Sequence, residues 1–112
     1  MIFRQLFDSV SSTYTYILGC SSTFDAVVID PVFEQHTRDT ALIRELGLNV
    51  RYVLDTHCHA DHVTGAWLIH EALNAQVVIS GRCTAENVGL PVDHGDVLEF
   101  GRCSLTVRAT PG

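Results

Sequence analysis

Residues 55–62 read Asp-Thr-His-Cys-His-Ala-Asp-His, and they directly follow the apolar run Tyr52-Val53-Leu54. His57 and His59 are two residues apart, so on a helix their side chains would point to nearly opposite sides. On a strand end or an extended segment, residues two apart share one face and can bind one ion. The spacing therefore favours an extended segment that carries a metal site at the end of a buried strand.

Asp61 and His62 add a second pair of ligands to the same stretch. They follow the small residue Ala60, where the chain can turn and present both side chains. Neutral imidazole and carboxylate are ligands that Zn(II), Fe(II) and Mn(II) accept. The alternative is a polar loop whose histidines only cap the following helix. Three histidines and a carboxylate so close together favour the metal site.

The other three histidines lie in stretches that indicate structural roles. His36 is beside the start of an expected helix, so we expect an exposed ring or a neighbour of the helix cap. His70 falls within a second expected helix, on its surface. His94 lies in a turn before a strand.

The composition is that of an ordinary globular protein, with 46% hydrophobic and 18% charged residues in 112. This length fits one domain with a core of its own. The net charge is −6, and no cluster of lysine and arginine is present. These features argue against a nucleic-acid partner and against an anionic membrane surface. No run approaches the roughly 18 apolar residues of a membrane span.

Four cysteines stand at positions 20, 58, 83 and 103, and none forms a Cys-x-x-Cys pair. An even count alone is weak evidence for disulfides. We therefore expect Cys20, Cys83 and Cys103 to be reduced thiols, mostly buried as small apolar side chains. The N-terminal residues lack a basic segment followed by a long apolar core, which predicts no secretory signal and a cytoplasmic protein.

Short apolar runs bounded by turn residues predict strands, and two amphipathic stretches predict helices between them. The first helix should begin at the N-cap Thr37 and end at Gly47, and the second should run from Gly65 to about Leu73. The expected strands are residues 13–18, 26–29, 52–54, 76–80, 97–100 and 104–109. This alternation places helices against a sheet in an α/β layered domain.

Residues 56–62 are similar to the signature of the metallo-β-lactamase superfamily. More narrowly, the chain resembles the N-terminal half of persulfide (sulfur) dioxygenases, which are relatives of glyoxalase II. The stretches that carry this resemblance are residues 13–19, 28–32, 46–48, 56–65, 93–96 and 100–102. The similarity extends over essentially the whole chain, so it is more specific than the metal motif alone.

The resemblance implies an αββα sandwich, of which this chain forms the N-terminal half, a mixed sheet with helices packed on one side. It implies one Fe(II) per chain, held by two histidines and one aspartate. The implied reaction converts glutathione persulfide and O₂ to sulfite and glutathione. Such a facial triad leaves positions open for substrate sulfur and O₂.

Within the motif, the resemblance maps the first iron ligand to His57. His59, Asp61 and His62 match ligands of the dinuclear zinc relatives, and in the dioxygenases they are expected to line the site as hydrogen-bonding partners. These four side chains are our candidate metal-binding residues, and Asp61 is our candidate catalytic residue. Cys58 is expected to pack rather than react.

The resemblance also bears on the extent of the domain. In the family, the segment matching residues 109–112 continues directly into the second histidine ligand, and the aspartate ligand comes later still. We therefore expect residues 1–112 to be a partial metallo-β-lactamase domain, truncated before the second histidine ligand and inactive by itself.

Two further hypotheses remain open. A glyoxalase II-like thioester hydrolase would use the same four side chains to hold two Zn(II) ions and activate water. The other is a non-catalytic half-domain that binds metal weakly or pairs with another chain. A half sandwich would expose the apolar face that its other half should cover, so a homodimer is among the expected assemblies.

Overall fold

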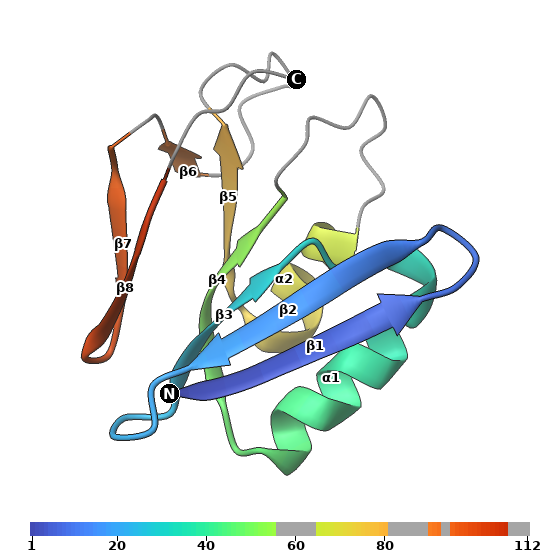
Figure 1. Cartoon of the computed structure of the whole chain (residues 1–112), viewed down its shortest axis with the longest axis horizontal. Coiled ribbons are helices and arrows are strands. Elements are labelled where there is room, and N and C mark those ends of the chain that lie inside the picture. The colour runs from blue at the N-terminus through green and yellow to red at the C-terminus, as the bar shows by residue number, and fades with distance from the viewer. Residues whose placement is uncertain (56–64, 81–89, 93–94, 108–112) are drawn as a thin grey trace.

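The computed structural model describes residues 1–55, 65–80, 90–92 and 95–107. Within these residues, six strands form one sheet in the order β1-β2-β3-β4-β5-β6 (Figure 1). Two further strands form a separate hairpin. The strands are β1 (Ile2–Asp8), β2 (Thr13–Gly19), β3 (Asp25–Ile29), β4 (Asn49–Leu54), β5 (Gln76–Ser80), β6 (Leu90–Val92), β7 (Val97–Phe100) and β8 (Cys103–Thr106).

Two α-helices connect the parallel strands. A 3-10 turn, η1 (Phe33–Gln35), leads into α1 (His36–Glu45), which joins β3 to β4. The second helix, α2 (Gly65–Leu73), precedes β5. No helix in this part of the chain is long and apolar enough to cross a membrane.

The strand directions bring several strand ends to one edge of the sheet. β2 is antiparallel to both β1 and β3, whereas β3, β4, β5 and β6 are mutually parallel neighbours. The carboxyl ends of β1, β3, β4 and β5 therefore lie at the same edge. In open α/β sheets this edge is where ligands bind.

Both helices cover one face of the six-stranded sheet. Ala26 and Val28 of β3 point to this face and pack in one apolar cluster with Ile43 of α1 and Ile69 of α2. All four side chains are fully buried. β3 and β5 are continuous apolar runs, as expected of strands that are covered on both faces. This pattern is the reason that the sequence predicts both strands.

The opposite face carries the β7–β8 hairpin over part of its area (Figure 1). Val27, which alternates with the helix-facing residues of β3, packs there against Phe100 of β7. Beyond the hairpin, aromatic rings of β1 and β2 are exposed on the sheet: Phe3 is 51% exposed, Phe7 48% and Tyr14 46%. The rings of Phe7 and Tyr14 pack with centroids 4.9 Å apart.

The structure confirms most of the expected elements and corrects three. α2 and β5 have the expected bounds, and Gly47 follows α1 as expected. Thr37 is not the N-cap of α1. The helix begins one residue earlier, at His36, because η1 runs directly into it, and the N-cap Gln35 makes no side-chain capping hydrogen bond. β8 begins at Cys103 and ends at Thr106, whereas the sequence predicted 104–109, of which 108 and 109 lie outside the described residues. β4 begins earlier than expected, at Asn49.

Gly47 and Gly101 provide a paired test of how tightly the hairpin packs on the sheet. Both adopt the left-handed conformation, with φ of +69° and +68°. A Cβ at Gly47 would meet nothing within 4 Å, whereas one at Gly101 would overlap Thr23 Oγ1 and lie 3.1 Å from Cys20 Sγ. Gly47→Ala should therefore lower the free energy of unfolding by about 1 kcal/mol, from backbone strain alone. Gly101→Ala should cost about 1–2 kcal/mol more, because the turn is overpacked. Urea unfolding measures both, and equal costs would contradict the close contact at Gly101.

Candidate metal centre

The metal motif itself, with His57, His59, Asp61 and His62, lies outside the described residues, as does Cys58. The structure does describe the two elements that bound this segment. β4 ends at Leu54, and α2 begins at Gly65. The motif therefore departs from the carboxyl edge of the sheet, at the end of a strand whose Val53 is fully buried.

The ends of β3 and β4 are joined at this edge. Ile29 and Leu54 are paired in the parallel register, and the backbone N–H of Asp30 donates a hydrogen bond of 2.7 Å to the carbonyl oxygen of Leu54. Asp55, the last described residue before the motif, is half-buried. The point from which the motif leaves the sheet is thus held by its neighbouring strand.

Asp30 adopts an unusual backbone conformation at this position. Its φ is +55°, in the left-handed region that residues with a Cβ seldom occupy. The hydroxyl of Thr15, which is fully buried, donates a hydrogen bond of 2.8 Å to the Asp30 carbonyl oxygen. Strained backbone of this kind persists only when surrounding contacts hold it, and it is common at functional sites. Neither Asp30 nor Thr15 was among the predicted site residues. The Asp30-Pro31 pair directly after a buried strand is the feature of the sequence that could have indicated Asp30.

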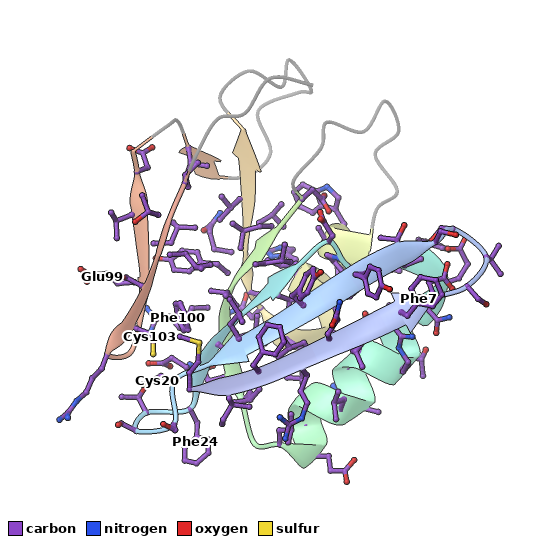
Figure 2. All side chains as sticks on the ribbon, in the orientation of Figure 1. Phe7, Cys20, Phe24, Glu99, Phe100 and Cys103 are labelled. Carbon is purple, nitrogen blue, oxygen red and sulfur yellow. The ribbon has the colours of Figure 1, made fainter. Side chains whose placement is uncertain are left out.

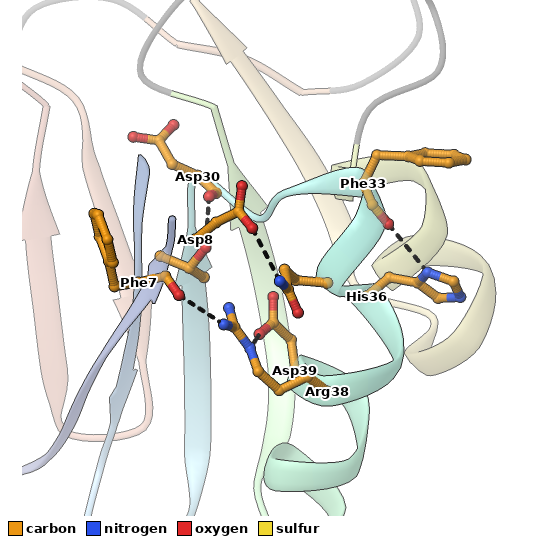
Figure 3. A network of polar contacts seen from close by, with 9 residues as sticks. Phe7, Asp8, Asp30, Phe33, His36, Arg38 and Asp39 are labelled. Atoms are coloured by element: carbon orange, nitrogen blue, oxygen red, sulfur yellow. Dashed lines mark hydrogen bonds and ion pairs between the residues drawn. The ribbon is translucent and has the colours of Figure 1, made fainter. Parts of the chain in front are cut away.

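A polar network supports the same edge at the end of β1 (Figure 3). One carboxylate oxygen of Asp8 accepts hydrogen bonds from the Ser11 backbone N–H (3.0 Å) and hydroxyl (2.6 Å), and the other accepts one from Gln35 Nε2 (2.9 Å). These hydrogen bonds hold the pKa of Asp8 below its usual range, and the bond from Gln35 contributes most. The β1–β2 turn is thereby tied to the 3-10 turn that follows β3.

Arg38 and Asp39 continue this network into α1. Arg38 Nε donates to Asp39 Oδ1 at 3.0 Å, and Arg38 Nη1 donates to the carbonyl oxygen of Phe7 at 3.0 Å (Figure 3). Asp39 is fully buried, and burial raises the pKa of its carboxyl group. Among the described residues, Asp39 Oδ2 and Arg38 Nη2 are buried without a hydrogen-bond partner. The pair fixes the start of α1 against the end of β1.

The Asp8 contacts predict how stability responds to acid. Because the folded-state pKa of Asp8 is lowered, its stabilising effect is present above the unfolded-state pKa and is lost as the pH falls through the folded-state value. Gln35→Leu removes the hydrogen bond that lowers the pKa of Asp8 most, so the folded-state pKa should rise toward the unfolded-state value. The variant should therefore be less stable at neutral pH and should lose less stability as the pH falls. Urea midpoints measured from neutral pH downward test this, with Gln5→Leu on the exposed face of β1 as the matched control. If both variants lost the same stability between neutral and acidic pH, the role of the Gln35 hydrogen bond at Asp8 would be contradicted.

The histidines outside the motif have structural roles where they are described. His36, the first residue of α1, is half-buried, and its Nδ1 lies 3.1 Å from the Phe33 carbonyl oxygen (Figure 3). The ring of His70 is half-buried rather than on the surface, and its Nδ1 lies 2.7 Å from the Ala75 carbonyl oxygen. It thereby links the end of α2 to the start of β5. His94 lies outside the described residues.

The described residues offer no competing metal site, since no group of three or more His, Cys, Asp or Glu side chains gathers among them. The candidate donors remain those that the sequence predicts within residues 57–62, which lie outside the described residues. Three imidazoles and one carboxylate fit either Fe(II) or Zn(II), both of which bind nitrogen and oxygen ligands.

The family follows from the fold and from a match to a known sequence model. Residues 9–82 match the model of the Metallo-beta-lactamase superfamily. The strand order, the helices on one face and the motif after β4 agree with that match. The chain belongs to the metallo-β-lactamase superfamily, and it forms part of that fold.

Within the superfamily, the chain is a homologue of persulfide dioxygenases. It is 44% identical over all 112 residues to the human protein "Persulfide dioxygenase ETHE1, mitochondrial". It superimposes with a TM-score of 0.90 on the crystal structure of ETHE1 from Myxococcus xanthus, at 49% identity over the whole chain. It covers 44% of the human protein and 49% of the bacterial chain, and it corresponds to their N-terminal part.

A more distant relative is named as a hydrolase rather than as a dioxygenase. The chain is 30% identical over 102 residues to a hydroxyacylglutathione hydrolase from a Polaromonas strain. That match covers 88% of this chain and 38% of the hydrolase.

Proposed function

We propose that the protein to which this chain belongs is a glutathione-dependent persulfide dioxygenase. The observation that carries the proposal is the 44% identity to the human persulfide dioxygenase over all 112 residues, with the metal motif included. The reaction would be glutathione persulfide plus O₂ plus water giving glutathione, sulfite and two protons. Because the chain spans under half the length of its relatives, the activity is proposed for the product of the whole reading frame that contains these residues.

In this proposal, His57 is a ligand of a single Fe(II), and His59, Asp61 and His62 orient the ligands and the substrate by hydrogen bonds. The iron would supply the redox chemistry by which O₂ oxidises the substrate sulfur. The described residues act on the site indirectly. The bonds that join Asp30 to Leu54 and Thr15 hold the strand ends from which the motif departs. Rigid strands position a site more accurately than loops do, so these bonds should matter for the orientation of His57.

The second candidate is a glutathione thioester hydrolase of the glyoxalase II type. The match to hydroxyacylglutathione hydrolase favours it, as do the four potential zinc ligands in the motif. Two Zn(II) ions would then activate a water molecule for attack on the thioester. Both candidates act on a glutathione sulfur compound, and they differ in the metal and in the use of O₂.

Metal content separates the two candidates. The protein expressed from the whole reading frame and purified without oxygen should contain one iron per chain by elemental analysis. Two zinc ions per chain would overturn the dioxygenase proposal in favour of the hydrolase. A protein that retains no metal would contradict both candidates.

A further inference from the structure

The turn after β2 encloses the thiol of Cys20, on the face of the sheet opposite to the helices. Cys20 is 2% exposed and packs against Val27 and Phe100. The turn is closed by hydrogen bonds of 2.8 Å from Cys20 N to Asp25 O and from Phe24 N to Cys20 O. This end of β2 is adjacent to the start of β3, so Cys20 lies at the edge opposite to the one from which the metal motif departs.

Several donors point at the Cys20 sulfur. The backbone N–H of Arg102 donates to it at 3.4 Å across the β7–β8 turn. Together with Thr23 and the backbone of Ser22, it lowers the pKa of Cys20 to about 6, with the Thr23 side chain contributing most. Such a concave set of donors stabilises an anion, and a thiol with this pKa is largely thiolate at neutral pH.

A second thiol lies beside the first. Cys103 is the first residue of β8, is half-buried and packs against the cluster that contains Cys20 and Phe100. Figure 2 shows the two sulfur atoms next to each other, between the end of β2 and the hairpin. Burial, followed by the hydrogen bond and charge of Cys20, raises the pKa of Cys103. A thiolate and a neutral thiol are therefore in contact, and the other group that acts on Cys103 is the α-amino group of the N-terminus.

We propose that Cys20 and Cys103 form an oxidisable thiol pair, which a hydroperoxide converts into a disulfide between the six-stranded sheet and the β7–β8 hairpin. In the first step the Cys20 thiolate attacks the peroxide, the O–O bond breaks, and sulfenic acid and hydroxide form. In the second step the Cys103 thiol attacks that sulfur, an S–S bond forms, and water leaves. The sum is two thiols and one hydrogen peroxide giving one disulfide and two waters.

The burial of Cys20 selects the class of oxidant. Hydrogen peroxide is about the size of two water molecules and can reach a sulfur that is 2% exposed, whereas a bulky disulfide such as oxidised glutathione cannot align with it. Cys103 is half-buried and lies next to Cys20, so it is placed to act as the resolving thiol. The pair is remote from the metal motif along the chain and in the sheet, so this site is separate from the proposed active site.

The chain has two other cysteines, and removing them isolates the pair. The Cys58→Ser/Cys83→Ser variant of the protein expressed from the whole reading frame, treated with hydrogen peroxide, should lose the thiols of Cys20 and Cys103 without forming dimers through them. Digestion without reduction should give one peptide pair joined through Cys20 and Cys103, and dithiothreitol should restore both thiols. Absence of that joined pair, or disulfides between chains instead, would overturn the proposal.

A third substitution tests which sulfur reacts first. In the same background, Cys103→Ser removes the resolving thiol, so dimedone should capture a sulfenic acid at Cys20. The oxidation rate should rise with pH around a midpoint of about 6, and Thr23→Val should move that midpoint upward. Dimedone labelling of Cys103 in the matched Cys20→Ser variant, at a rate equal to that of Cys20, would contradict the assigned order. Mapping of the wild-type disulfide decides the pairing even where a variant folds poorly.

Discussion

His57→Ala is expected to remove the iron and to lower persulfide-dependent O₂ uptake by more than about 100-fold, because in the proposed site it deletes one of three protein ligands. His59→Ala should lower the activity less, by about 10–100-fold, because in the proposed site His59 orients the ligands without binding the metal. Both are measured as iron content per chain and as O₂ consumption with glutathione persulfide. The matched control is His36→Ala, whose ring lies against the Phe33 carbonyl oxygen, the Phe33 ring and the Thr37 hydroxyl.

The metal contents of His57→Ala and His59→Ala distinguish the iron site from a dinuclear zinc site. In a dinuclear zinc site His57 and His59 are both ligands, so both substitutions would reduce the metal content to a similar degree. Equal loss of metal in His57→Ala and His59→Ala would therefore contradict the assignment of His57 alone as the ligand within this motif. A loss of activity in His36→Ala would show that the effect is not specific to the motif.

Phe100→Ala is expected to lower the free energy of unfolding by about 3–5 kcal/mol, the range for a fully buried aromatic side chain. Among the described residues, Phe100 is the largest of the fully buried side chains, and it joins the β7–β8 hairpin to Val27 of the main sheet. Val97→Ala, on the same strand but 53% exposed, should change stability by less than about 0.5 kcal/mol. Urea unfolding measures both. A loss of under about 1 kcal/mol in Phe100→Ala would show that the hairpin does not depend on this contact.

The elements that were predicted correctly are those whose apolar pattern reflects burial directly. β5 is a short apolar run covered on both faces, and α2 has Ala66 and Ile69 three residues apart on its buried face. In such elements the local pattern and the tertiary environment agree. The same agreement makes Gly47 recognisable at the end of α1, where a positive φ is required.

β1 and β6 were missed because partners distant in sequence determine them. In β1, Phe3 and Phe7 are exposed and Ile2 and Leu6 are partly buried, so no clear contrast of polar and apolar residues marks the strand. β1 is a strand because it pairs with β2 along its whole length. β6 is three residues long and has Pro91 at its centre, which argues against a strand in sequence reasoning and suits an edge position in the sheet.

The candidate metal ligands could be predicted from the sequence. The polar contacts that hold the strand ends next to them could not. Clustered ligands such as His57 and Asp61 can be recognised from spacing alone. The contacts of Asp8 with Ser11 and Gln35, by contrast, require β1 to be in place, and no local pattern predicts that. The left-handed conformation of Asp30 likewise depends on bonds to residues 15 and 24 positions away in sequence.

We propose that the enzyme to which this chain belongs oxidises glutathione persulfide with O₂. The most direct test is O₂ consumption by the iron-loaded product of the whole reading frame, with an acylglutathione thioester supplied as substrate in a parallel assay. We expect one O₂ to be consumed and one sulfite to form per glutathione persulfide, with no hydrolysis of the thioester. Thioester hydrolysis without O₂ uptake would contradict it.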